Sequence, residues 1–234
     1  MLEVCVESLE GVRVATAAGA DRMELSERLD VGGVTPSVDL LRRANDHRDI
    51  GTRPIIALIR CRPGDFYFDA VEQRQMLDEI QMAIDAGCSG VAVGASHPSN
   101  ELNWSFLEVI ATRYRDTELV VHRVFDTVPD SMLAIPRLIE LGYRRILTSG
   151  GANHAVDSLD RLREWQHTFG DRIEILPAGG IGSSNAAKIL EVTGCKQLHG
   201  SFRGSVTVEG KRIPDPEEIR AVRSLLFSKE DGDR

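Results

Sequence analysis

The chain has 234 residues, 42% of them hydrophobic, which is enough to bury the core of a single α/β domain. Its formal net charge is -8 with acidic and basic residues interspersed, so we expect no nucleic-acid partner, which would favour a basic face. No apolar run approaches the roughly 18 residues that span a bilayer, and the N-terminus does not resemble a signal peptide. We therefore expect a cytoplasmic protein with no membrane partner.

Short apolar runs alternate with longer amphipathic segments along the chain, a pattern typical of strands followed by helices. Strands are predicted at residues 2–6, 21–25, 54–60, 90–94, 119–126, 145–148, 172–177 and 196–199. Helices are predicted from the Ser8 cap to Gly19, from Pro36 to about His47, and at or near residues 70–86, 104–110, 129–141, 159–165, 186–192 and 215–227.

The unit of strand, loop and helix occurs eight times, and barrels of eight such units have about 250 residues. The sequence therefore predicts an α/β fold, a single (β/α)8 TIM barrel over residues 1–227. A doubly wound open sheet would need a dinucleotide-binding fingerprint after the first strand, and residues 7–11 do not provide one. Residues 228–234 are polar and are predicted to form a disordered C-terminal tail.

Several predicted strands carry ionisable residues where a packed barrel interior would need only Val, Ile and Leu. Since side chains alternate along a strand, the side chains expected to point into the barrel are Glu3, Arg22, Glu24, Arg60, His122 and His199. Ligands bind at the carboxyl ends of barrel strands, so these residues predict a polar pocket there. The alternative is a set of internal ion pairs, such as Glu24 with Arg60, that fix the strand register.

In the predicted pocket, His122 or His199 would act as acid or base, while Arg60 and Arg22 would bind an anion. The candidate catalytic residues are Glu3, Glu24, Arg60, His122, Asp126 and His199. Asp126 is assigned to the rim loop. Arg123 is expected to point the opposite way along its strand and to be structural.

Glycine-rich loops follow the last predicted strands, at residues 179–185 and 200–203. Many barrels bind phosphate in these places through backbone N–H groups and a helix N-terminus. The candidate anion-binding residues are Arg22, Ser149, Gly150, Gly179, Gly180, Asn185, Ser201 and Arg203. The alternative is that the glycines only form tight turns.

Motifs at nearly every strand end resemble the CutC family, which is named for copper homeostasis. The matching segments are residues 2–6, 19–25, 32–37, 59–66, 122–126, 145–150, 178–181 and 198–201. The resemblance implies a cytoplasmic TIM barrel that forms a homodimer or higher homo-oligomer and is linked to copper handling.

The sequence departs from the family pattern at two cysteine positions. Ser26 stands where the family commonly has a cysteine after Glu-Leu, and Cys61 lies in the loop that follows Arg60. Copper(I) prefers soft thiolates, so Cys5 and Cys61 are the candidate metal ligands. The four cysteines show no paired spacing and are expected to be free thiols, and the alternative role for Cys5 and Cys88 is that of small buried hydrophobes.

Two functions remain open from the sequence. In one, the protein binds copper, as the family resemblance implies. In the other, it is a metal-independent enzyme, an isomerase, lyase or hydrolase that transfers protons on a small anionic or phosphorylated metabolite. The expected partner is accordingly a copper ion or a small anionic molecule.

Overall fold

The computed structural model describes residues 1–46 and 53–227, so the predicted tail at 228–234 and the predicted helix end near His47 lie outside the described residues. The barrel strands are β1 (Leu2–Val6), β2 (Arg22–Leu25), β3 (Ile55–Ile59), β4 (Gly90–Val93), β5 (Glu118–Val121), β6 (Arg145–Thr148), β7 (Glu174–Pro177) and β8 (Leu198–Gly200). The helices are α1 (Leu9–Ala17), α2 (Val38–Asp46), α3 (Ala70–Asp85), α4 (Trp104–Arg113), α5 (Ser131–Glu140), α6 (Leu159–Phe169), α7 (Ser183–Thr193) and α8 (Pro216–Phe227).

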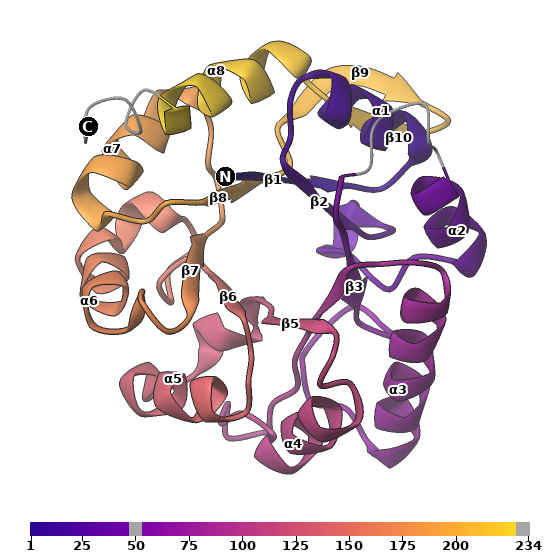
Figure 1. Ribbon diagram of the computed structural model, residues 1–234, viewed down its shortest axis with the longest axis vertical. Coiled ribbons are helices and arrows are strands. Elements are labelled where there is room, and N and C mark those ends of the chain that lie inside the picture. Colours follow the sequence, from indigo (N-terminus) through magenta and orange to yellow (C-terminus); the bar gives the residue numbers. More distant parts are fainter. Residues whose placement is uncertain (47–52, 228–234) are drawn as a thin grey trace.

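The eight strands are parallel and stand in the order β7-β6-β5-β4-β3-β2-β1-β8. The two ends of the sheet, β7 and β8, lie side by side and bring the barrel close to closure, with the helices forming an outer ring (Figure 1). The predicted TIM barrel is thus confirmed.

Local signals in the sequence explain where the helices begin. The Ser8 side chain accepts a hydrogen bond from the backbone N–H of Gly11, and Asp69 forms a capping box with Glu72 at the start of α3. The strands are buried on both faces, as expected for a parallel sheet under helices. Their inward side chains form an apolar layer across the middle of the barrel: Ile56, Leu58, Ala92, Val120, Leu147, Leu176 and Ala178.

The amino end of the barrel is filled by buried ion pairs. Arg22, the first residue of β2, pairs with Glu3. Arg145, the first residue of β6, pairs with Glu118 and, at 2.8 Å, with Glu174. These groups compensate one another's charges beneath the apolar layer, so the charged residues of this end are structural.

Two segments depart from the predicted elements. Strand β5 ends at Val121, and residues Arg123–Thr127 form a 3-10 helix, η3, instead of continuing the strand. A hairpin of β9 (Arg203–Val208) and β10 (Lys211–Pro214) follows β8 and packs beside α1 (Figure 1). It was not predicted, and it places Arg203 beside the carboxyl end of β8.

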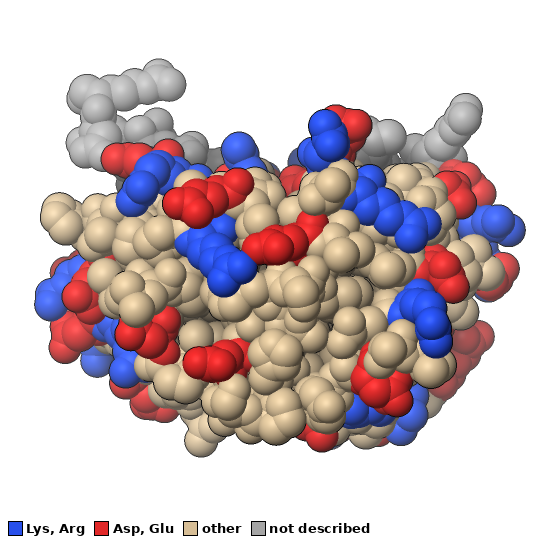
Figure 2. Space-filling model, turned by 90° about the horizontal axis from the view of Figure 1, so that it is seen from below, with Lys and Arg blue, Asp and Glu red and all other residues tan. Residues whose placement is uncertain are grey.

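The surface agrees with the charge pattern of the sequence. Figure 2 shows acidic and basic side chains interspersed over one side of the molecule. Within residues 1–46 and 53–227, no helix has the length and apolar character needed to cross a membrane.

We expect Arg22→Met to lower the free energy of unfolding by about 3–5 kcal/mol, because it removes the guanidinium that pairs with the buried Glu3 carboxylate and leaves only His199 beside it. Urea denaturation at neutral pH measures the loss. Arg43→Met is the matched control, since the Arg43–Asp39 pair is exposed and such pairs contribute about 0–1 kcal/mol. A loss no larger than that of the control would show that the pair is not what compensates Glu3.

The same pair predicts a pH dependence. Although burial favours its neutral form, Arg22 and then His199 lower the pKa of Glu3 to about 2, from an ordinary value of 4.5. A carboxyl group with a lowered pKa stabilises the fold above its unfolded-state pKa, and the stabilisation is lost as the pH falls through the folded-state value. The Glu3 contribution is therefore expected to fade between pH 4.5 and about 2, and stability curves of wild type and Arg22→Met should converge there.

Candidate functional site

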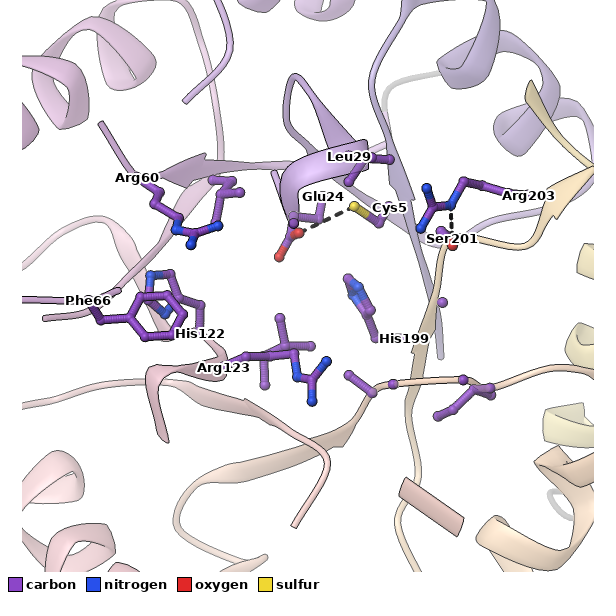
Figure 3. Close-up of a pocket in the computed structure, with 18 residues that line it drawn as sticks. Cys5, Glu24, Leu29, Arg60, Phe66, His122, Arg123, His199, Ser201 and Arg203 are labelled. Carbon is purple, nitrogen blue, oxygen red and sulfur yellow. Dashed lines mark hydrogen bonds between the residues drawn. The ribbon is translucent and has the colours of Figure 1, made fainter. Parts of the chain in front are cut away.

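A cavity of about 290 Å³ opens at the carboxyl ends of the strands (Figure 3). Its wall includes Cys5 of β1, Glu24 of β2 and His199 of β8, together with Arg60 and His122, which follow β3 and β5. The structure therefore brings together five of the polar side chains selected from the sequence. Further lining residues include Leu29, Gly32, Phe66, Arg123, Gly179, Gly180, Ile181, Ser201 and Arg203.

The floor of the cavity is a connected set of buried polar side chains. The Sγ atom of Cys5 lies 3.4 Å from Oε1 of Glu24, and ligand atoms of Cys5, Glu24 and His199 lie within 4.8 Å of one another. Beneath them, Nδ1 of His199 lies 2.7 Å from Oε1 of Glu3, whose other carboxylate oxygen pairs with Arg22. The floor is thus held in place by the ion pairs of the amino end.

Burial and these contacts set the protonation of the floor. Burial opposes a charged imidazolium, but the hydrogen bond with Glu3 and the negative charge of Glu24 outweigh it, so the pKa of His199 is raised. Burial raises the pKa of Glu24, although His199 opposes this shift. Burial and the charge of Glu24 also raise the pKa of the Cys5 thiol well above its usual value. Cys5 is accordingly a neutral thiol at neutral pH.

One wall of the cavity is formed by His122, Phe66 and Arg60. The ring centroids of His122 and Phe66 are 5.0 Å apart, and the Arg60 guanidinium lies 4.9 Å from the Phe66 centroid. Arg60 donates to the backbone carbonyls of Gly33 at 3.1 Å and Gly64 at 2.5 Å. These carbonyls, and not Glu24, hold the guanidinium, so the alternative of an internal Glu24–Arg60 ion pair is wrong.

The rim residues differ from their predicted positions. Because β5 ends before His122, the chain turns and Arg123 lines the cavity instead of pointing away from it. Arg123 donates to Asp126 at 2.8 Å and to the Ser149 hydroxyl at 2.8 Å. Asp126 also accepts hydrogen bonds from Thr148 Oγ1 at 2.5 Å and from the backbone N–H groups of Ser149 and Gly151. Its oxygens are occupied in fastening the loop after β6, a structural position outside the cavity wall.

Half of the eight candidate anion-binding residues do not line the cavity, and these four form hydrogen bonds or ion pairs within the protein. The Ser149 N–H is bound by Asp126, the Gly150 N–H donates to Thr148 Oγ1, and Arg22 lies at the opposite end of the barrel. Asn185 accepts from the Gly182 N–H and donates to the Gly180 carbonyl, so it caps α7. The four candidates that do line the cavity are Gly179, Gly180, Ser201 and Arg203.

The N-terminus of α7 already binds a carboxylate from the chain itself. Glu218 of α8 accepts hydrogen bonds from the Ser183 N–H at 2.6 Å and the Ser183 hydroxyl at 2.8 Å. This position is where a phosphate was expected after β7. No local signal in the sequence identifies Glu218, because it comes from a helix 35 residues further along the chain.

The predicted metal pair of Cys5 and Cys61 is not assembled. Cys61 is absent from the residues that line the cavity, and it lies half-buried against the hydrophobic core. Burial, with the charges of Glu79 and Glu72 in α3, raises the pKa of Cys61 to about 11. The structure instead places Glu24 and His199 beside Cys5.

Comparisons with known proteins agree with the motifs at the strand ends. A family model described as the CutC family matches residues 1–204. The chain is 37% identical over 203 residues to a CutC family protein of Pasteurella multocida, covering 87% of this chain and 82% of that protein. It is 36% identical over 238 residues to one of Sinorhizobium medicae, covering 97% and 96%.

A solved structure shows the same architecture. The CutC protein from Streptococcus agalactiae, whose description refers to copper homeostasis, superposes with a TM-score of 0.81 at 29% identity. The match covers 86% of this chain and 98% of that chain.

We expect Asp126→Asn to destabilise the protein by about 1–3 kcal/mol, because an amide replaces a carboxylate whose oxygens accept several hydrogen bonds. Thermal denaturation measures the effect, with Asp116→Asn in an exposed turn as the matched control. If both variants unfold at the wild-type temperature, Asp126 does not fasten the loop after β6.

Proposed function

The chain belongs to the CutC family, and we propose that it acts in copper homeostasis by binding a copper(I) ion through Cys5, Glu24 and His199. The observation that carries this proposal is the convergence of their ligand atoms within 4.8 Å of one another at the floor of the cavity. A thiolate and an imidazole suit copper(I), and the carboxylate supplies a third, harder donor. The name of the family supports copper over other metals.

The surroundings of His199 support its role as a ligand. Since Nδ1 of His199 faces Glu3, Nε2 is the nitrogen available to a metal ion. Histidines that bind metals commonly donate their other N–H to a carboxylate, which orients the ring and makes it a better ligand. Glu3 is itself held by Arg22, so the proposed ligand is oriented by two further buried side chains.

Metal binding in this site is coupled to proton release. The raised pKa of Cys5 means that the thiol must lose a proton before the sulfur coordinates the ion. Where the imidazole of His199 is charged, its Nε2 must also release a proton, because the pKa of His199 is raised as well. The Cys5 proton alone makes the apparent affinity rise about tenfold per pH unit while the pH is below the pKa of the thiol. Binding is therefore expected to tighten from pH 6 to pH 8 by a factor of about 100 or more.

We expect anaerobic titration with copper(I), in competition with a chromophoric chelator, to give one tightly bound ion per chain. Cys5→Ser removes the only thiolate of the proposed site and should weaken binding by more than about 100-fold. Cys61→Ser is the matched control and should bind like the wild type, because Cys61 lies outside the cavity. Equal binding by wild type and Cys5→Ser would contradict the proposal.

A second candidate function is favoured by the arginines around the cavity. Arg60 and Arg203 both line it, from different sides (Figure 3), and within the described parts of the chain neither forms a salt bridge with a carboxylate. A small anion would compensate these charges. With Glu24 and the His199–Glu3 pair as proton donors and acceptors, the cavity would then support metal-independent isomerase, lyase or hydrolase chemistry.

Calorimetric titration of the metal-free protein with malonate tests this second candidate. We expect binding at millimolar concentrations, weakened about tenfold by Arg203→Ala, because one charge-assisted hydrogen bond is lost. Arg212→Ala, an exposed residue of β10, is the matched control and should leave binding unchanged. A metal-free wild-type protein that binds neither malonate nor inorganic phosphate would contradict the second candidate without affecting the first.

A further inference from the structure

Two buried N–H groups in the cavity wall have no acceptor among the described residues. They are Nε2 of His122 and Nε of Arg60. Both residues line the cavity, and both lie against Phe66, at 5.0 Å and 4.9 Å from its ring centroid. Buried polar groups in native proteins nearly always have a hydrogen-bond partner, so two unpartnered groups at one wall indicate a ligand that supplies the acceptors.

The hydrogen bonds of His122 determine its tautomer. Its Nδ1 accepts a hydrogen bond from the backbone N–H of Val124 at 3.2 Å, where η3 begins. A nitrogen that accepts carries no proton, so the hydrogen of the neutral ring lies on Nε2. His122, which lines the cavity, is therefore a hydrogen-bond donor through Nε2, and accepting a second proton would break the bond to Val124.

The neighbours of His122 keep its ring neutral. Burial and then the positive charge of Arg60 lower the pKa of His122 to about 3, and the negative charge of Asp126 offsets this only in part. Phe66 on one side and Gly94 at the end of β4 contribute no charge.

The ring is also fixed in position. A Cβ atom at Gly94 would lie 3.2 Å from Cε1 and 3.3 Å from Nδ1 of His122, so the imidazole lies close against the backbone after β4. Phe66 lies close to the ring, at 5.0 Å between centroids. A donor held by backbone on one edge and by an aromatic ring nearby has its orientation set before a ligand binds, the arrangement that makes hydrogen bonds in a site effective.

We propose that the cavity binds a small organic anion with a planar carboxylate or carbonyl group, whose oxygens accept hydrogen bonds from Nε2 of His122 and Nε of Arg60. The inference rests on the second candidate function and assigns its ligand class. A planar group suits the space beside Phe66, which flanks both donors. His122 then polarises the ligand as a neutral hydrogen-bond donor. Glu24 and His199, and not His122, act as acid and base.

The tautomer is tested on the wild-type protein without any ligand. Nitrogen-15 NMR of the histidine side chains should show His122 with a protonated Nε2 and an unprotonated Nδ1, both at neutral pH and at about pH 5, where an ordinary histidine is charged. A charged His122 at about pH 5, or a proton on Nδ1, would overturn the inference.

The donor role is tested with malonate and two variants of His122. His122→Gln keeps an N–H donor but cannot act as a base at neutral pH, so its affinity should stay within about tenfold of wild type. His122→Leu keeps the volume but has no donor and should bind about 10–100-fold more weakly. His97→Leu, in an exposed loop and outside the residues that line this cavity, is the matched control, and circular dichroism checks that each variant is folded.

The outcomes separate the inference from the function on which it rests. Wild-type affinity in His122→Leu, or an equal loss in His122→Gln and His122→Leu, overturns the donor role while anion binding stands. A wild-type protein that binds inorganic phosphate but not malonate overturns the inferred ligand class while anion binding stands. A wild-type protein that binds neither contradicts the anion site itself and therefore also the inference.

Discussion

The buried carboxylate of Glu3 connects the two ends of the barrel. One of its oxygens pairs with Arg22 at the amino end, and the other faces His199 at the floor of the cavity. Isolated, this charge would be too costly to bury, and it is stable only because both partners are present. The orientation of His199 therefore depends on an ion pair formed deeper in the fold.

The two ends differ in how completely their polar groups are paired. At the amino end, Arg22 and Arg145 are compensated by buried or half-buried carboxylates. At the carboxyl end, Cys5 and Glu24 face a cavity, and His122 and Arg60 each keep an N–H group without an acceptor. If the polar residues only stabilised the barrel, both ends should be paired equally well. The unpaired groups therefore support binding of a ligand at the carboxyl end.

Periodicity and capping residues are local features, and they predicted the barrel and nearly all of its elements from the sequence. Side-chain alternation placed Glu3, Arg22 and Glu24 on inward faces, but alternation says nothing about height along the barrel axis. Arg22 begins its strand and so lies at the amino end, away from the predicted anion. Cys5 and Glu24 lie beside His199 because the first and last strands pair with each other, and residue spacing does not reveal this pairing.

Other differences have equally specific causes. Arg123 lines the cavity because His122 caps η3 and ends β5 early. The sequence does contain a signal for the β9–β10 hairpin, the pair Glu209-Gly210 between two segments of alternating residues. These two residues adopt positive φ values of 51° and 78°, as a two-residue hairpin turn requires. The expected cytoplasmic location and homo-oligomeric assembly stay predictions.

The most direct measurement is a crystal structure of the protein loaded anaerobically with copper(I), with diffraction data collected on both sides of the copper absorption edge. We predict one anomalous peak at the floor of the cavity, within bonding distance of Cys5 Sγ and a nitrogen of His199, with Glu3 still in contact with that histidine. A peak at Cys61, or no peak between β1, β2 and β8, would contradict it.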